Sequence, residues 1–513
     1  MPYLGLSPLP VVLAPARAIP PIPAEPPVTM SDAPLRDLTI PPSRKRAQSE
    51  SYLLSKHNVL KAFDGVEDLA TDERTLTEKD RDAVLHHLLQ LRSAVARVLW
   101  KAGLYTGTSI LDDFVLEVTK SGQPDICGRV IDRLRQAGVE RPGFVLYPLT
   151  EFGMEVPFFG SEPDLRDFAV FREADFAVTA QTGSVDGAYA RLNEMAAALG
   201  ITTVPDRFSF EHHVRAGNMR WMTRNPLLLV RLSSHTGAYY ENQFIYTLKI
   251  RVAAAMVVML HALSVDAGIT VDKFHSSAEV SNDETLDIRH YLIGEATRAD
   301  KPLSLRRVPM RVGALELARL SDLAVTLSTR TLARPELRAL EQRLTPALRA
   351  VERGYLRYVN LTSGERVHSR VFRRLVTAID WYRQSFGSRT NEAEAIVALA
   401  VAFETLLTDH YAPGSVARLE RRVGICLAKR PNVRQYQDSV VAVHKARSEI
   451  VHTGDGGRET DIHRAQAAFA LCFLEVASRL DRLDRTMSDP IRELLGDSLT
   501  TEEVKATGDT GTT

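Results

Sequence analysis

Apolar residues recur at helical spacing in several long segments of this chain. The first segment begins at Thr77, which stands where an N-cap belongs, with Asp80 three residues later. An apolar stripe then runs from Val84 to Leu99, and Gly103 ends it. The pattern therefore predicts a helix over residues 77–103.

The pattern changes between residues 105 and 240, where short β-like runs appear between Gly, Pro, Ser and Asp residues. The runs are GFVLYPL, DFAVTAQT and PLLLVRLSS, and GAYARLNEMAAALG lies among them as a helix with a glycine stop. No G-x-G-x-x-G, P-loop or H-E-x-x-H motif occurs in this part of the sequence. It is typical of an α+β domain without a recognisable nucleotide or zinc motif.

Helical patterns dominate from residue 241 onward. Two long ones are ENQFIYTLKIRVAAAMVVMLHALS and RPELRALEQRLTPALRAVERGYLRYV, and five further helical blocks lie between His368 and Leu480. Asn391 and Glu394 have capping-box spacing before the second block. Pro413-Gly414 ends that block, and Pro431 separates the third from the fourth. A bundle of about 115 residues is a comfortable single domain.

Together these patterns predict an α+β multidomain protein, with a mixed α/β N-terminal region and a mostly α C-terminal part ending in a helical bundle. The expected parts are a disordered proline-rich segment (1–55), an α+β domain (56–240), a mostly helical middle region (241–365), the bundle (366–486) and a polar tail (487–513).

The composition limits the classes of protein that the chain can belong to, but it does not indicate a function. Lys plus Arg and Asp plus Glu both number 64, so net charge does not indicate a polyanion partner and does not exclude a local basic patch. The three cysteines, Cys127, Cys426 and Cys472, form no C-x-x-C, which favours a reducing, cytoplasmic setting without disulfide or zinc. The longest apolar stretch, Val252–Leu260, is far shorter than the roughly 20 residues of a membrane span, so we expect a buried core helix. The apolar N-terminus lacks a basic region and is interrupted by prolines, which argues against a signal peptide.

One pair of residues suits metal-independent RNA cleavage. Arg447 and His452 stand near the close of a predicted helix, separated by four residues. A guanidinium can hold a phosphate bidentately and stabilise charge in the transition state, and an imidazole can move a proton to or from a ribose 2′-hydroxyl. Spacing alone does not single this pair out, because it also occurs at Arg81/His86, Arg207/His212 and Arg458/His463.

The surroundings of the pair resemble the Apea-like branch of the HEPN family. In that branch an "ALE-LL" helix precedes a helix ending in "R-S-x-I-V-H-G"; here the two elements read AFETLL (402–407) and RSEIVHTG (447–454). The resemblance covers about residues 368–485. It implies a HEPN-type helical bundle and metal-independent RNA cleavage in bacterial defence or toxin action, with the N-terminal region sensing or regulating.

Carried over by position, the resemblance gives each residue a role. Arg447 and His452 would be the catalytic or RNA-contacting pair, and Glu404 the acidic residue that faces them and orients the arginine. The family commonly forms dimers whose two sites share a cleft, so a homodimer is implied. No metal, cofactor or membrane is expected.

Two other interpretations of these residues remain open. The bundle would be a non-catalytic RNA- or nucleotide-binding or dimerisation module, which the departures from the family pattern at Ser448 and Thr453 favour. Alternatively, Glu404 and Arg447 would form a buried ion pair that fixes helix packing, with His452 capping the helix end.

Further candidates lie nearby and elsewhere. His444, three residues before Arg447, would share its helix face and the cleft, or would simply be solvated. On the third block, RNA phosphates would be contacted by Arg418, Arg421 and Arg422, unless these form a solvated face. Glu211, His212 and His213 lack a further ligand that would make them a metal site.

Overall fold

The computed structural model describes residues 38–72, 74–102, 108–136, 142–150, 152–154, 168–232, 243–269, 290–295, 302–309, 322–360, 365–387, 392–410, 414–453 and 460–498. Most of the expected proline-rich segment lies outside these residues. Its last part was predicted wrongly, because Arg44–Ser55 forms helix α1, with Ser43 capping its first turn.

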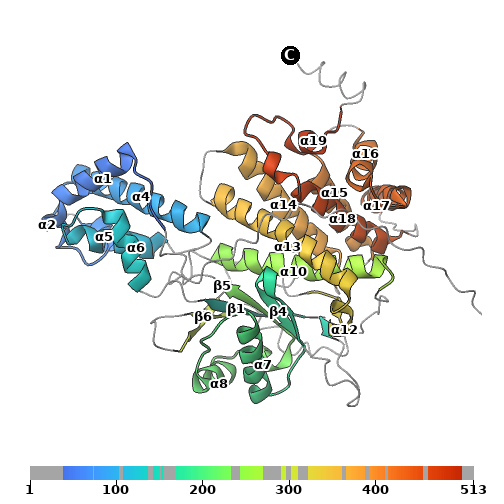
Figure 1. Cartoon of the computed structure of the whole chain (residues 1–513), viewed down its shortest axis with the longest axis horizontal. Helices are drawn as coiled ribbons and strands as arrows, with labels where there is room; N and C mark the ends of the chain where they lie inside the picture. The colour runs from blue at the N-terminus through green and yellow to red at the C-terminus, as the bar shows by residue number, and fades with distance from the viewer. Residues whose placement is uncertain are drawn as a thin grey trace, which may run out of the picture.

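A group of helices with its own core comes first. It contains α1, α2 (His57–Leu60), α3 (Val66–Thr71), α4 (Glu78–Lys101), α5 (Thr108–Lys120) and α6 (Ile126–Gln136). The Thr77 hydroxyl accepts a hydrogen bond from the Asp80 amide at 3.2 Å, which confirms the expected start of α4. The core of this group, from Leu53 to Leu134, is separate from that of the rest, and the group lies to one side of the molecule (Figure 1). Residues 56–240 are therefore not one α+β domain, since an all-helical unit precedes the sheet.

An antiparallel sheet of six strands follows, in the order β3-β4-β5-β1-β6-β7. The strands are β1 (Gly143–Pro148), β3 (Phe168–Phe171), β4 (Phe176–Thr179), β5 (Leu227–Leu232), β6 (His290–Glu295) and β7 (Ser304–Pro309). In β1, Val145 and Tyr147 face one core while Phe144 and Leu146 face another, as the two-residue period of a strand requires. A second, two-stranded sheet pairs β2 (Gly153–Met154) with β8 (Thr326–Leu327) in parallel.

The strands confirm three expected runs, and two more lie in a region predicted to be mostly helical. β1, β4 and β5 coincide with the β-like runs seen in the sequence. By contrast, β6 and β7 fall within residues 241–365, which the sequence predicts to be mostly helical. That region completes the sheet and also supplies α10 (Gln243–Asp266), α12 (Thr329–Leu332) and α13 (Pro335–Tyr355).

Helices cover both faces of the large sheet. One face packs against α7 (Val185–Ala198), α8 (Arg207–Arg215) and α9 (Trp221–Arg224), and the other against α10. In Figure 1, α7 and α8 lie below the sheet and α10 above it. Residues Ala253–Leu260 of α10 are buried all round, because the sheet lies on one side and other helices on the other. Among the described helices, α10 alone is long and apolar enough to cross a membrane, and most of it is buried inside the protein.

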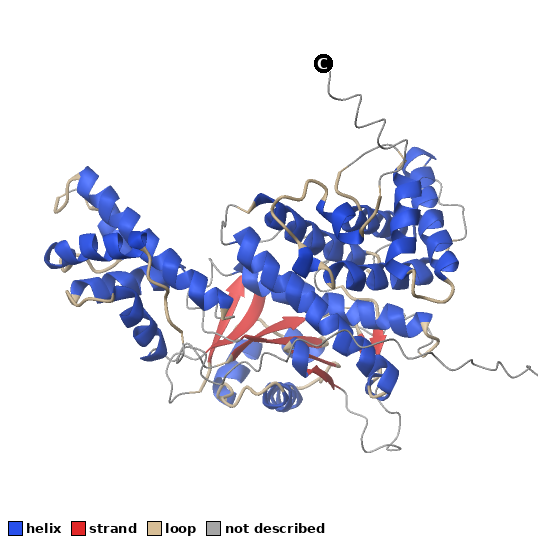
Figure 2. Ribbon diagram, turned by 45° about the horizontal axis from the view of Figure 1, so that its top comes forward, coloured by secondary structure: helices blue, strands red, loops and turns tan. Residues whose placement is uncertain are grey.

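The five helical blocks expected after residue 366 are all present. They are α14 (Arg366–Gln384), α15 (Glu392–Leu407), α16 (Ser415–Leu427), α17 (Val433–Thr453) and α18 (Ile462–Ala477). These helices pack together and against α10 and α13, as Figure 2 shows above the strands. A single hydrophobic core runs from the sheet into the bundle, so the boundary expected at residue 365 is not a boundary between cores.

The segment expected as a polar tail begins with an ordered helix. Helix α19 (Pro490–Leu495) buries Ile491, Leu494 and Leu495 against the bundle. Any polar tail therefore begins after this helix, and residues beyond 498 lie outside the described residues. All three cysteines are buried and unpaired as disulfides.

Candidate functional site

Helices α15 and α17 bring Glu404 and His444 into contact. Glu404 is the one charged residue between Ile396 and Leu407, so the rest of this part of α15 is uncharged. Its Oε1 lies 2.8 Å from Nε2 of His444. An ionised carboxylate only accepts, so this nitrogen carries the proton that is shared in the hydrogen bond. The His444 side chain is 10% exposed and that of Glu404 33%, which leaves the pair at the edge of the bundle.

The electrostatics of Glu404 follow from this contact. The hydrogen bond from His444 lowers the pKa of the Glu404 carboxyl; burial opposes that effect, and the charges of His444 and Arg447 reinforce it. Glu404 is therefore ionised at neutral pH and keeps the imidazole of His444 in one orientation.

The lowered pKa predicts that the Glu404 contribution to stability is lost in acid. The folded chain protonates this carboxyl at lower pH than the unfolded chain does. Its contribution is therefore complete above the ordinary value of 4.5 and disappears as pH falls through the folded-state pKa. After solvent screening we expect about 0.5–1 kcal/mol. Urea unfolding of wild type and Glu404→Gln should show this difference near pH 7 and a smaller one near pH 3.5. An equal difference at both pH values would contradict the assignment.

Arg447 lies on the same face of α17 as His444, one turn further along. Its side chain is partly buried, and its Nε–H has no hydrogen-bond partner within the described part of the chain. Glu404 thus hydrogen-bonds His444 and acts on Arg447 through charge alone. The sequence predicts that Glu404 orients Arg447 directly. Within the described residues, no hydrogen bond or ion pair joins these two side chains.

His452 lies in the last turn of α17 and is exposed. The helix continues to Thr453, whose hydroxyl donates to the Glu449 carbonyl at 2.7 Å. Arg447 and His452 are thus both helical, and five residues of helix separate their directions by about 140°. Within one chain they point to different sides of α17. Gly454 of the sequence motif lies outside the described residues.

The arginines of α16 correct a sequence expectation. Arg418 and Arg422 are buried, so they do not form a surface for RNA phosphates in this structure. Arg421 donates to both carboxylate oxygens of Asp497, at 2.6 and 3.0 Å, and Arg422 donates to the same carboxylate at 2.8 Å. Asp497, just after α19, therefore neutralises the charges of Arg421 and Arg422.

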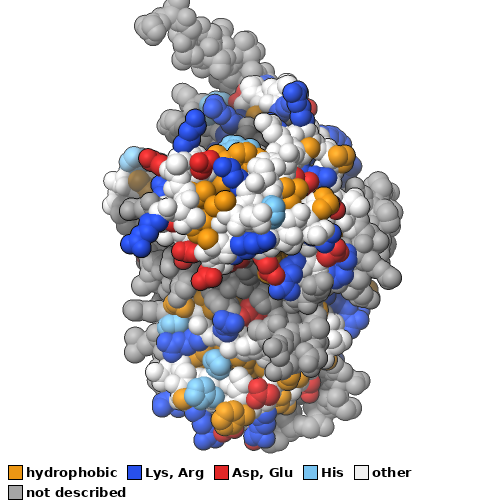
Figure 3. Space-filling model, turned by 90° about the vertical axis from the view of Figure 1, so that its left-hand side faces the viewer, with side chains coloured by type: hydrophobic (Ala, Val, Ile, Leu, Met, Phe, Trp, Pro, Cys, Tyr) orange, Lys and Arg blue, Asp and Glu red, His pale blue; other side chains and the backbone are white. Residues whose placement is uncertain are grey.

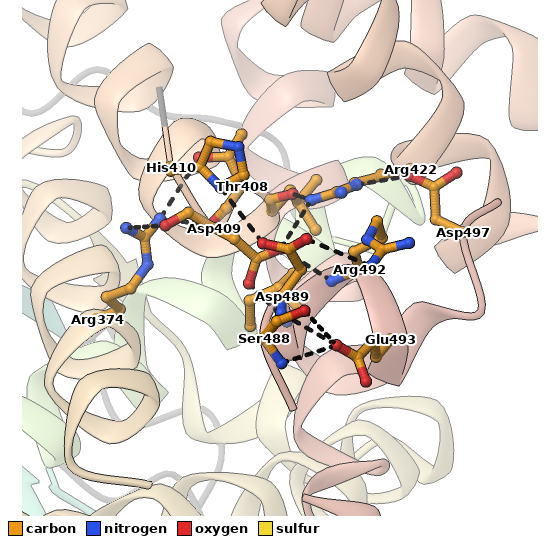
Figure 4. A network of polar contacts seen from close by, with 12 residues as sticks. Arg374, Thr408, Asp409, His410, Arg422, Ser488, Asp489, Arg492, Glu493 and Asp497 are labelled. Atoms are coloured by element: carbon orange, nitrogen blue, oxygen red, sulfur yellow. Dashed lines mark hydrogen bonds and ion pairs between the residues drawn. The ribbon is translucent and has the colours of Figure 1, made fainter. Parts of the chain in front are cut away.

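This contact belongs to a network that fixes the end of α15 (Figure 4). Asp409 accepts hydrogen bonds from the amides of Ile491 and Arg492, at 2.8 and 3.0 Å, and so caps the start of α19. Arg374 donates to the carbonyls of Glu404 and Thr405 at 3.2 and 2.9 Å. The network holds the turn of α15 that carries Glu404. Nothing local in the sequence marks these partners, because they lie about 30 to 80 residues apart.

The remaining sequence candidates fall elsewhere. His212 and His213 lie on α8, where the His213 Nδ1 contacts the Ser209 carbonyl at 2.8 Å. Among the described residues, no group of three or more His, Cys, Asp or Glu side chains is placed to hold a metal ion.

Comparison of the chain with protein-family models, with curated proteins and with solved structures finds no match.

Proposed function

We propose that the C-terminal bundle is a HEPN-type, metal-independent endoribonuclease of the bacterial defence or toxin kind, acting in the cytoplasm, and that the preceding region senses or regulates. The observation that supports this most is the gathering of Glu404, His444 and Arg447 where α15 meets α17, on the helix that ends at His452. The resemblance of residues 368–485 to Apea-like domains points the same way.

In this proposal Arg447 binds the scissile phosphate. Its Nε–H is buried and has no partner within the described residues, so a phosphate oxygen that enters the site would satisfy this donor. An imidazole takes the proton of the ribose 2′-hydroxyl, whose oxygen attacks phosphorus. The imidazolium returns this proton to the 5′-oxygen of the next nucleotide as its bond to phosphorus breaks, giving a 2′,3′-cyclic phosphate and a 5′-hydroxyl end. His452 is the better proton carrier because it is exposed, whereas His444 is buried against Glu404.

A homodimer reconciles this role with the helix geometry. Arg447 and His452 of one chain point about 140° apart. In a symmetric dimer the arginine of one copy and the histidine of the other can face one cleft. We therefore propose that the active form is a dimer whose sites combine two copies of α17.

The test is cleavage of single-stranded RNA by the purified full-length protein in EDTA. We expect fragments ending in a 2′,3′-cyclic phosphate and a 5′-hydroxyl, from wild type but not from His452→Ala. An exposed histidine of α4, altered as His86→Ala, is the matched control and should cleave normally. Cleavage that stops in EDTA, or that His452→Ala retains in full, would refute the proposed mechanism.

A second candidate function is a non-catalytic module that binds RNA or nucleotide or forms the dimer. It is favoured by the hydrogen bond between Glu404 and His444, because a contact that only holds the two helices together would have the same geometry. This candidate predicts RNA binding or dimer formation without any cleavage, and the same EDTA assay distinguishes the two.

A further inference from the structure

Helix α8 carries a large aromatic side chain on the surface. Phe208 is 82% exposed, the highest value among the exposed large apolar residues. Two residues on, Phe210 is fully buried and packs with the sheet, together with Val214. The helix is thus held by one face and presents Phe208 on the other, although a buried position would be more favourable for a phenyl ring.

The same outward face is basic. His212 and Arg215 follow Phe208 by four and seven residues, so the three lie along one side of α8. Arg207 is exposed beside them. Together these four side chains form what we call the α8 surface.

Neighbouring elements add charge at the end of α8. Arg307, on the edge strand β7, donates through Nη1 to the Gly217 carbonyl just after the helix. Arg220 follows in the same turn region and is exposed. A cationic rim therefore continues from the helix onto the sheet edge.

The acidic partners at this surface are exchangeable. Arg215 pairs with Glu211 at 2.9 Å with its own side chain 71% exposed, and Arg207 pairs with Asp186, where both side chains are more than half exposed. Ion pairs so exposed contribute little, and an incoming phosphate can replace the carboxylate.

Figure 3 shows this side of the molecule. In its lower part, where α8 lies, Lys or Arg and His side chains gather around hydrophobic side chains at the surface. An exposed aromatic ring beside arginines is an arrangement that binds single-stranded nucleic acids. A base stacks on the ring, and the guanidinium groups bind the phosphates.

We infer that the α8 surface is a docking site for single-stranded RNA, with Phe208 stacking on a base and Arg207 and Arg215 binding the flanking phosphates. The inference goes beyond the proposed chemistry of the bundle and stands without it. A lone exposed ring with arginines on either side fits an unstacked strand better than a duplex, whose bases are covered.

The test is fluorescence anisotropy of a labelled 12-nucleotide oligouridylate with the full-length protein in EDTA; 2′-O-methyl groups on the probe prevent the cleavage proposed above. Phe208→Ala should weaken binding about tenfold. The double variant R207Q/R215Q should weaken it further and reduce the salt slope by about 1.4, the value for two phosphates on a single strand. Leu89→Ala and Arg133→Gln are matched exposed controls on α4 and α6 and should bind as wild type.

The outcomes separate the possible ligands. Equal losses for the matching oligothymidylate would support a single-strand site that does not read the 2′ substituent of the sugar. Unchanged RNA affinity in both α8 variants would overturn the inference. It would also be overturned if the two variants lost binding only to vesicles that contain phosphatidylglycerol and not to RNA. Cleavage assays keep this result apart from the proposed function: weaker RNA binding by both α8 variants, found in a protein that does not cleave RNA, would support the α8 inference and refute the proposed nuclease.

Discussion

Replacing Arg447 by alanine is expected to lower RNA cleavage by about 100- to 1,000-fold, the loss found when one donor to a transition-state oxyanion is removed. The guanidinium is the only group of the proposed site with a buried N–H that lacks a partner within the described residues. Its removal leaves Glu404 and His444 bonded to each other, so folding should be little affected.

Single-turnover cleavage and thermal unfolding of the same preparation would measure both effects. Arg434→Ala, on the same helix and with a side chain 70% exposed, is the control and should cleave normally. Arg447→Lys keeps the charge without the fork of donors and should recover only part of the rate. Full activity in Arg447→Ala with unchanged melting would remove the arginine from the mechanism.

Mixing two inactive variants tests the shared site. If each site combines Arg447 of one copy with His452 of the other, a mixed dimer of Arg447→Ala and His452→Ala contains one intact site. Random pairing of equal amounts then restores about a quarter of wild-type activity. A site contained within one chain would give none.

The second large effect is on stability. Asp497→Ala is expected to destabilise the bundle by about 3 kcal/mol, because it leaves the buried Arg422 with only its 3.5 Å carboxylate contact to Asp409 and removes the carboxylate of the partly exposed Arg421. The Asp497 side chain is 1% exposed and that of Arg422 4%. Burial alone would raise the pKa of Asp497, but the hydrogen bonds from Arg421 and Arg422 outweigh it and lower the pKa.

Chemical denaturation at neutral pH would measure the loss. Asp438→Ala is the matched control, since Asp438 also pairs with an arginine but is 64% exposed, and its change should stay below about 1 kcal/mol. The Asp497 contribution should be complete above the ordinary carboxyl pKa and decrease as pH falls through its lower folded-state pKa. A loss for Asp497→Ala no larger than the control would show that the network is not stabilising.

The sequence predicts most of the bundle because the signals there are local. Each helix from α14 to α18 has an apolar stripe between breakers such as Pro413-Gly414 and Pro431. Helix α1 was missed because it buries only Ser49 and Leu53, which is too little for a stripe. Strand β7 was missed because Arg306 and Arg307 are adjacent and both exposed at the sheet edge, which breaks the two-residue alternation.

The site could be predicted only in part, because its contacts join distant residues. Glu404, His444 and Arg447 were all candidates. Because Glu404 and His444 are 40 residues apart, the sequence does not indicate which turn of α17 faces α15. The pairing of Arg421 with Asp497 spans 76 residues and has no local signal. Likewise, Phe208 and Phe210 look alike in sequence, and only the packing of α8 on the sheet shows which one is exposed.

The position of Asp497 has a consequence for synthesis of the chain on the ribosome. Residues are added at about 5–20 per second, so the carboxylate that neutralises Arg421 is made about 4 to 15 seconds after the arginine. During that interval Arg421 lacks its carboxylate, and Arg422 has only the longer carboxylate contact to Asp409 at 3.5 Å. A chain shortened before residue 497 is therefore expected to have a less stable bundle than the full chain.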